Sequence, residues 1–251
     1  MPKVVFVANS KGGVGKTTVA SVIAEVYRAT RGRLPKLVDC DSRHKLVKIF
    51  GDCVTAIELS ASTDELIANP DLIVSYWDGL GDHIMGGDDV VIDLGANVDR
   101  SVFEWAARSR FADYLGEIQV DVVVPATAEP LAIEGARVLL ESAAAVFPAA
   151  RRVLVLNEGH GGFSAYEAAP DYKRLVGLPG LQVVRLPKCT SAIWGDLERD
   201  GLSFAKAIEL GPDKIGPALG MTARPWVAAR ALGDLGRWAE AVKTAFGPLY
   251  P

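Results

Sequence analysis

Short apolar runs alternate along this chain with longer segments that have the apolar spacing of helices. Val4 to Ala8 is a continuous apolar run, which predicts a short buried strand. The segment Val19 to Tyr27 predicts a helix, because Val22, Ile23 and Val26 fall on one face at helical spacing. The repeated alternation predicts an α/β fold, a doubly wound, mostly parallel twisted sheet with helices on both faces.

The same patterns predict the elements that follow. Further strands are predicted at residues 35–38, 54–59, 120–125, 153–156 and 183–186, and one more ends at Asp93. Helices are predicted at residues 62–77, 103–114 and 224–246, with another that Pro130 opens. The last helix has an apolar stripe and balanced charges, which favours packing on the core over membrane targeting. Internal repeats and low-complexity segments are absent from the sequence, and we expect residues 1–251 to form one domain.

A glycine-rich stretch, NSKGGVGKTT from Asn9 to Thr18, separates the first predicted strand from the first helix. Its glycines allow the backbone to curl and to turn several N–H groups inward. Such a nest at a helix N-terminus binds phosphate oxygens. Lys16 supplies a positive charge for the outer phosphates, and the Thr17 hydroxyl is placed to coordinate Mg²⁺. The alternative is a glycine-rich turn without a ligand, which the flanking strand and helix and the adjacent lysine and threonine disfavour.

The loop resembles a variant of the phosphate-binding motif. The general P-loop pattern requires glycine at the position of Ser10, so that pattern does not fit. The run KGGVGKTT from Lys11 to Thr18 matches, at every position, the deviant Walker A motif of the ParA/MinD family of ATPases, and the chain resembles that family. The resemblance implies ATP and Mg²⁺ as ligands, with the nucleotide held by Gly12, Gly13, Val14, Gly15, Lys16, Thr17 and Thr18.

Lys11 has a separate expected role. A lysine on an exposed loop is usually a solvated charge. In the family that the loop resembles, the corresponding lysine reaches across a dimer interface to the partner's nucleotide. A second cation near the phosphates stabilises charge on the transferring group, so that hydrolysis depends on dimerisation. The resemblance therefore implies that Lys11 and Lys16 are catalytic in a homodimer that forms on ATP binding.

A strand that ends in Asp39-Cys40-Asp41 is expected beside the loop, because ligands gather at the carboxyl ends of parallel strands. The resemblance implies that Asp41 is catalytic and positions or polarises the attacking water. The alternative for Asp41 is a helix N-cap for residues 42–50, and both roles can hold at once. Many partition ATPases continue with Pro-Gln at this point, whereas this chain has Ser42-Arg43.

The strand that ends at Asp93 is predicted to be the Walker B segment. In that role the Asp93 carboxylate orients Mg²⁺, so Thr17 and Asp93 are the predicted metal residues. Gly95 would allow its backbone to approach the γ-phosphate. The segment continues as Leu94-Gly95-Ala96-Asn97, and this continuation, with the layout of the C-terminal third, looks like the TraL type of ParA-like ATPases encoded with conjugal transfer systems.

Asn157 and Pro187 follow two of the later predicted strands. In the family, an Asn at the first of these strand ends and the loop after the second hold the adenine. An amide suits this task, because its donor and acceptor match the purine edge. The alternative for Asn157 is a turn residue that closes a strand.

Charge and cysteine content narrow the classes of function. A net charge of −4 argues against a protein that coats DNA by bulk charge, so DNA binding would need a local basic patch. Cys40, Cys53 and Cys189 form no CxxC pair, which disfavours a metal-cluster carrier and a disulfide framework. Since no apolar stretch is long enough to span a bilayer and the cysteines suit a reducing compartment, we expect a cytoplasmic protein.

Together these features predict an ATPase that acts as a switch. We expect it to bind and slowly hydrolyse ATP, to dimerise on ATP, and to position DNA or a conjugation or secretion complex, as in plasmid partition. A protein partner would stimulate hydrolysis or be the object that is positioned. The alternative is a P-loop biosynthetic enzyme acting on a small carboxylate, which Lys11 and the lack of a second substrate motif disfavour.

Overall fold

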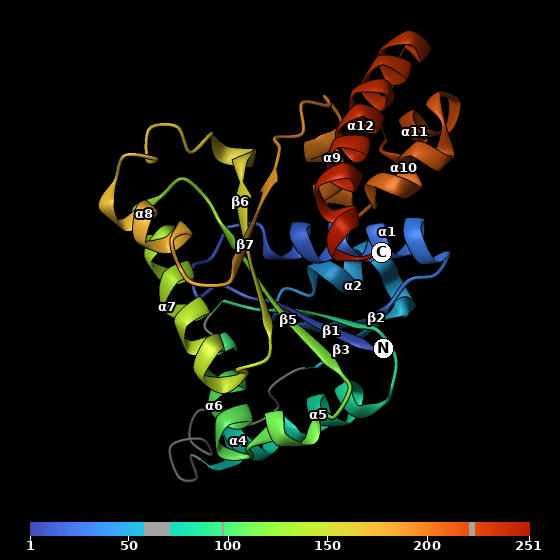
Figure 1. Ribbon diagram of the computed structural model, residues 1–251. Coiled ribbons are helices and arrows are strands. Elements are labelled where there is room, and N and C mark those ends of the chain that lie inside the picture. The colour runs from blue at the N-terminus through green and yellow to red at the C-terminus, as the bar shows by residue number, and fades with distance from the viewer. Residues whose placement is uncertain (58–70, 97, 221–223) are drawn as a thin grey trace.

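The computed structural model describes residues 1–57, 71–96, 98–220 and 224–251. At its centre is a seven-stranded sheet in the order β3-β2-β4-β1-β5-β6-β7, with parallel pairing throughout (Figure 1). The strands are β1 (Lys3–Val7), β2 (Lys36–Cys40), β3 (Val54–Ala56), β4 (Val90–Leu94), β5 (Gln119–Ala126), β6 (Arg151–Asn157) and β7 (Leu181–Leu186). The predicted α/β class with a parallel sheet is confirmed.

Helices cover both faces of this sheet (Figure 1). They are α1 (Lys16–Arg31), α2 (Lys45–Phe50), α4 (Asp71–Tyr76), α5 (Asp78–Met85), α6 (Val98–Arg108), α7 (Pro130–Val146), α8 (Pro170–Val176), α9 (Trp194–Asp200), α10 (Phe204–Leu210), α11 (Pro212–Ala218) and α12 (Pro225–Phe246). Alternate residues of β1 enter opposite cores, because successive side chains of a strand point to opposite faces. Val4 and Phe6 pack with α5 to α8, whereas Val5 and Val7 pack with α1 and α12.

One predicted helix has different bounds in the structure. The helix predicted at 103–114 is wrong at both ends, because α6 spans Val98–Arg108 and a separate 3₁₀ turn spans Phe111–Tyr114. Its first turn contains Asp99 and Ser101, so the apolar spacing begins only at Val102. The helix ends before Arg110, whose φ of 50° is incompatible with a right-handed helix.

The region between β3 and α4 is only partly described. β3 ends at Ala56, and residues 58–70, which include the end of the strand predicted at 54–59 and the start of the helix predicted at 62–77, lie outside the described residues. The helix predicted at 224–246 is confirmed as α12, which packs Leu235, Trp238 and Val242 into the core. None of the described helices combines the length and the apolar character that a membrane span requires.

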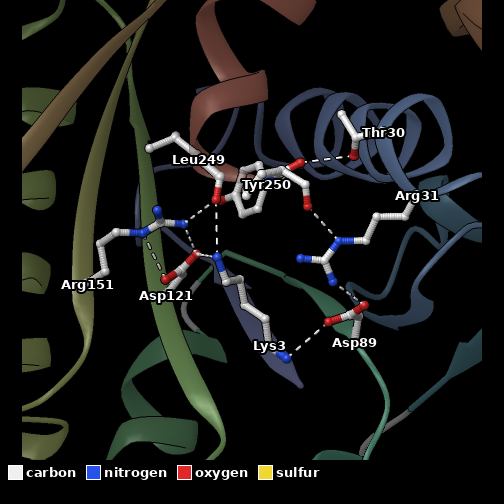
Figure 2. Close-up of polar contacts among 9 residues, drawn as sticks. Lys3, Thr30, Arg31, Asp89, Asp121, Arg151, Leu249 and Tyr250 are labelled. Atoms are coloured by element: carbon white, nitrogen blue, oxygen red, sulfur yellow. Dashed lines mark hydrogen bonds and ion pairs between the residues drawn. The ribbon is translucent and has the colours of Figure 1, made fainter. Parts of the chain in front are cut away.

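The end of the chain is bound to the amino ends of the central strands (Figure 2). Asp121 of β5 accepts hydrogen bonds from the guanidinium of Arg151, and its Oδ2 lies 3.9 Å from the Lys3 ammonium. The same two cations donate to the Leu249 carbonyl, Lys3 over 3.1 Å and Arg151 over 2.9 Å. Burial raises the pKa of Asp121 and lowers that of Lys3. One buried carboxylate therefore balances two cations that also hold the last turn of the chain.

A second carboxylate completes this network (Figure 2). Asp89, just before β4, accepts from the Lys3 backbone N–H over 3.1 Å and from Arg31 over 2.7 Å. The neighbouring Thr30 hydroxyl donates to the Tyr250 carbonyl over 2.9 Å. The C-terminus of α1 is thus tied both to the sheet and to the residues that follow α12.

We expect Asp121→Ala to lower the free energy of unfolding by about 3 kcal/mol, because it leaves the buried ammonium of Lys3 and the guanidinium of Arg151 without their shared counter-charge. Urea denaturation measures the change. The matched control is Asp113→Ala, whose exposed carboxylate pairs only with the exposed Arg110 and should cost less than about 0.5 kcal/mol. Equal losses in the two variants would contradict this account of the network.

Candidate nucleotide-binding site

The glycine-rich loop connects the carboxyl end of β1 to the first turn of α1, next to the ends of β4 and β5. Its shape depends on Gly13 and Gly15, whose φ angles of 80° and 90° lie in the left-handed region that side chains disfavour. Gly12 does not adopt a positive φ. The loop therefore curls as predicted, with two of its glycines essential for backbone conformation.

Asn9 anchors the start of the loop. Its side chain is fully buried, and its Nδ2 donates to the Pro125 carbonyl at the end of β5 over 2.8 Å. Its Oδ1 accepts from the Lys11 backbone N–H over 2.9 Å. An Asx turn of this kind is a local signal in the sequence, but the long-range bond to β5 exists only after folding. Asn9 was not among the predicted site residues.

The Lys16 side chain folds back along the inside of the loop. Its ammonium donates to the carbonyls of Asn9 and Lys11, over 2.9 and 3.2 Å, and the residue is 7% exposed. Burial lowers the pKa of Lys16, and the nearby carboxylates, Asp93 first among them, act in the opposite direction. Carbonyl oxygens are weaker partners for an ammonium than phosphate oxygens, so this cation is available to a polyanion.

Asp93 lies near the end of β4 and is 1% exposed. Among the described residues, neither of its carboxylate oxygens has a hydrogen-bond partner with normal geometry. The pKa of Asp93 is raised to about 7, chiefly by burial and also by the charges of Asp39 and Asp41, while the Thr17 hydroxyl and Lys16 act in the opposite direction. A buried carboxylate without partners beside a threonine hydroxyl fits the oxygen ligands that Mg²⁺ prefers.

The described residues do not supply a complete metal cage. They contain no group of three or more histidine, cysteine or acidic side chains arranged to hold a metal ion. Mg²⁺ usually binds through one or two protein oxygens, with water and phosphate oxygens completing its shell. Thr17 and Asp93 are therefore sufficient as the protein's part of a site that a nucleotide would complete.

The helix-capping role considered for Asp41 belongs to Asp39 instead. Asp39 is fully buried, and its Oδ2 accepts from the backbone N–H groups of Leu46 and Val47 in the first turn of α2, over 3.0 and 3.2 Å. The Asp41 carboxylate accepts from the nearby Arg43 N–H over 2.8 Å, and Asp41 lines a cleft beside the loop. The N-cap alternative for Asp41 is therefore wrong. Its carboxylate remains half-exposed at the site.

Gly95 permits a close contact between two strand ends. A Cβ at this position would lie 3.1 Å from the Cα of Asp41 and 3.1 Å from the carbonyl oxygen of Cys40. This packing holds the segment after β4 against the end of β2. Asn97, the last residue of the predicted Walker B continuation, lies outside the described residues.

Asp99 is a site residue that the sequence pattern did not indicate. It lies in the first turn of α6, is 2% exposed, and accepts a 2.6 Å hydrogen bond from the Ser10 hydroxyl through Oδ2. Its Oδ1 is buried and has no hydrogen-bond partner in the part of the chain that the structure describes. An aspartate in a first helical turn is common, so only the tertiary contact with the loop distinguishes this one.

Asn157 contacts the loop from the opposite side. Its Nδ2 donates to the Val14 carbonyl over 2.9 Å, and its Oδ1 accepts from the Gly159 N–H over 3.0 Å. The amide thus closes the turn after β6 and braces the phosphate loop. The carbonyl of Pro187, after β7, accepts from the Trp238 indole over 2.7 Å. Both residues line the cleft, and their contact with adenine stays a prediction.

A cleft of about 1190 Å³ joins these residues at the carboxyl ends of the strands. Its lining includes Lys16, Thr17, Asp41, Gly95, Asn157 and Pro187, and it extends to the helices α9 and α10. Lys11 is half-buried and does not line the cleft. Among the described residues, the Lys11 ammonium has no hydrogen-bond or ion-pair partner.

Comparison with known proteins gives structural matches alone. No protein-family model and no curated protein matches the sequence. One solved structure that resembles it is a Cyanothece McdA variant in complex with ATP, with 17% identity, a TM-score of 0.52 and a match over 89% of this chain and 98% of that chain. Another is the Aquifex aeolicus MinC:MinD cell division complex, with 13% identity, a TM-score of 0.49 and a match over 93% of this chain and 96% of that chain. A third is a plasmid partition protein from Borrelia burgdorferi, with 13% identity, a TM-score of 0.43 and a match over 79% of this chain and 95% of that chain.

The likeness to McdA extends over nearly the whole length of both chains. The chain has the fold of a ParA/MinD-type P-loop ATPase. In this ParA/MinD-type fold the predicted residues Lys16, Thr17, Asp41 and Asp93 come together at the loop. Lys11 lies outside that group, at the opening of the loop.

The unpartnered carboxylate of Asp93 gives a prediction about pH. Its folded-state pKa of about 7 lies above its ordinary value of 3.8, so ionised Asp93 destabilises the fold increasingly as the pH rises through this interval. At pH 8 in metal-free buffer, Asp93→Asn should therefore unfold at a higher temperature than the unchanged chain. The gain in free energy of unfolding should be a few kcal/mol, on the order of the free energy that corresponds to the pKa shift. Calorimetric scans should show the gap narrowing towards pH 5, and a gap that is independent of pH would contradict the assignment.

Proposed function

We propose that this chain is an ATP-dependent switch: it binds ATP with Mg²⁺ at the glycine-rich loop, dimerises on ATP and reopens after slow hydrolysis. The observation that carries the proposal is the pairing of a buried Lys16 ammonium with an unpartnered Asp93 carboxylate beside one phosphate-binding loop. The ammonium is suited to phosphate oxygens, and the carboxylate is suited to a divalent cation. The McdA structure of the same fold was determined with ATP, which supports this choice of nucleotide.

Each residue of the site has a separate role in ATP binding and hydrolysis. The loop N–H groups and Lys16 bind the phosphates and neutralise their charge. Thr17 and Asp93 would hold Mg²⁺, which supplies charge stabilisation to the phosphates when bound. Asp41, half-exposed in the cleft, orients the water that attacks the γ-phosphorus. The bond to the bridging oxygen breaks, and ADP and inorganic phosphate leave.

Lys11 completes the site from the second subunit. Its half-buried ammonium has no partner among the described residues and does not line its own cleft. The side chain is therefore free to reach the phosphates of a facing copy, where it would stabilise the charge of the transferring group. The switch would position a cargo, either DNA or a conjugation or secretion complex, and a partner protein would control the rate of hydrolysis.

Lys16→Ala should weaken Mg-ATP binding by about a hundredfold or more, because a phosphate charge then loses its buried partner. Isothermal calorimetry on the folded variant measures the affinity. Lys173→Ala on α8, which is exposed and on the other face of the sheet, is the control and should bind as the unchanged chain does. Unchanged affinity in Lys16→Ala would refute the assignment of the loop as the nucleotide site.

Lys11→Ala and Asp41→Ala should separate dimerisation from hydrolysis. The Lys11 variant should keep ATP binding by the single subunit but lose both ATP-driven dimerisation and hydrolysis, because its cation acts only in the dimer. The Asp41 variant should bind ATP, dimerise and stay closed. Size-exclusion chromatography with ATP and a phosphate-release assay give the two readouts. Dimerisation of Lys11→Ala equal to that of the unchanged chain would show that the lysine does not act across an interface.

A further inference from the structure

A hydrogen bond links the opening of the phosphate loop to helix α6. The Ser10 hydroxyl donates to Asp99 Oδ2 over 2.6 Å, although Ser10 is otherwise exposed. Asp99 is 2% exposed, so its acceptor oxygen is shielded from water. Hydrogen bonds from a hydroxyl to a carboxylate oxygen are among the stronger ones in proteins. The contact joins residues 89 positions apart in the sequence and holds the loop from outside.

The part of the protein that carries Asp99 is itself firmly placed. Asp99 lies in the first turn of α6, and the N–H of Val98 donates to the Gly95 carbonyl over 3.3 Å. Gly95 packs against the backbone of Asp41, as described above. Asp99 therefore has a fixed position relative to the strand ends that hold Asp93 and Asp41. Because Ser10 donates to Asp99, the opening of the loop is held at a fixed distance from these strand ends.

Lys16 braces the same stretch of backbone from inside. Its ammonium donates to the carbonyls of Asn9 and Lys11, the two residues that flank Ser10. A triphosphate competes for this ammonium, since phosphate oxygens are stronger acceptors than backbone carbonyls. When Lys16 turns to phosphate, the two carbonyl contacts are lost. The opening of the loop then keeps the contacts of Asn9, which donates to the Pro125 carbonyl and accepts from the Lys11 N–H, and the hydrogen bond that Ser10 donates to Asp99.

We propose that Asp99 is a positioning residue that holds Ser10, and thereby Lys11, in place once ATP has taken the Lys16 ammonium. The inference rests on the proposed function, because it concerns how Lys11 is presented to a facing subunit. Asp99 touches no phosphate in this account and acts only through Ser10. Its effect on Lys11 is therefore expressed in the ATP-loaded protein, where the Lys16 contacts are lost, whereas a purely structural role would affect the free and the loaded protein equally.

The test compares Ser10→Ala, Asp99→Asn and Asp99→Ala with a control, Ser109→Ala. Ser109 also donates a 2.6 Å hydrogen bond from its hydroxyl, but it does so to the Trp105 carbonyl in the last turn of α6, which Ser109 directly follows. Three quantities are measured for each variant: the melting temperature without nucleotide, ADP affinity by calorimetry, and the ATP concentration dependence of dimerisation by size-exclusion chromatography.

Ser10→Ala should weaken ATP-driven dimerisation by about tenfold to a hundredfold, the range for loss of a hydrogen bond to a charged group. Its ADP affinity and melting temperature should match those of the control. Asp99→Ala should dimerise as poorly as Ser10→Ala. Asp99→Asn should recover most of the loss, because the amide oxygen can still accept from the Ser10 hydroxyl. Ser10→Ala and Asp99→Asn keep the test decisive if Asp99→Ala does not fold.

A double-variant cycle identifies Lys11 as the residue acted upon. In a Lys11→Arg background, which keeps a cation with a different reach and therefore a measurable rate of hydrolysis, Ser10→Ala should cause a smaller loss than it does in the unchanged chain, because the two changes act on one effect. Additive losses would overturn the inference, as would normal dimerisation of Ser10→Ala or equal defects in Asp99→Asn and Asp99→Ala. If the unchanged chain binds Mg-ATP but does not dimerise, the proposed function fails and this inference fails with it. If it dimerises and Ser10→Ala does so equally well, the inference alone fails.

Discussion

The parallel, in-register pairing of the central strands determines where the strand-end carboxylates of the site lie. Asp93 of β4 pairs with Val7 at the end of β1 on one side and with Asp39 of β2 on the other. Parallel strands place their carboxyl ends at one edge of the sheet, so these residues meet beneath the phosphate loop. A shift of β4 by one residue would turn Asp93 into the opposite face and move Ile92 or Leu94 into its place.

Buried carboxylates are paired with cations at the amino ends of the strands, whereas two at the carboxyl ends have oxygens without a hydrogen-bond partner among the described residues. At the amino ends, Asp121 and Asp89 are paired with cations and with the carbonyls of the last residues of the chain (Figure 2). At the carboxyl ends, both oxygens of Asp93 and one oxygen of Asp99 have no hydrogen-bond partner within the ranges that the structure describes. Unpaired buried charge costs stability, so its concentration at one edge indicates groups reserved for a ligand. The paired edge provides stability that the site itself does not.

The loop is held by side chains that come from several parts of the chain. Asn9 ties its start to β5, Asn157 ties its middle to the end of β6, and Asp99 ties its opening to α6. A Cβ at Gly15 would come within 2.3 Å of the Asn157 amide nitrogen, which shows how tightly the loop and this side chain pack. A loop fixed in this way presents its N–H groups without a large loss of entropy on binding phosphate.

The sequence by itself determined the strand–loop–helix unit, the parallel α/β class and the identity of Lys16, Thr17, Asp41 and Asp93 as candidates. Those features are local, since apolar periodicity, glycine positions and strand-end aspartates are read within about ten residues. Only the tertiary structure decided that Asp39 rather than Asp41 caps α2, and that Asn157 braces the loop. The importance of Asp99 was also decided there, because a helix-opening aspartate is ordinary until folding brings Ser10 within 2.6 Å of it. Contacts between residues far apart in the chain depend on strand order and register, which no short pattern in the sequence specifies.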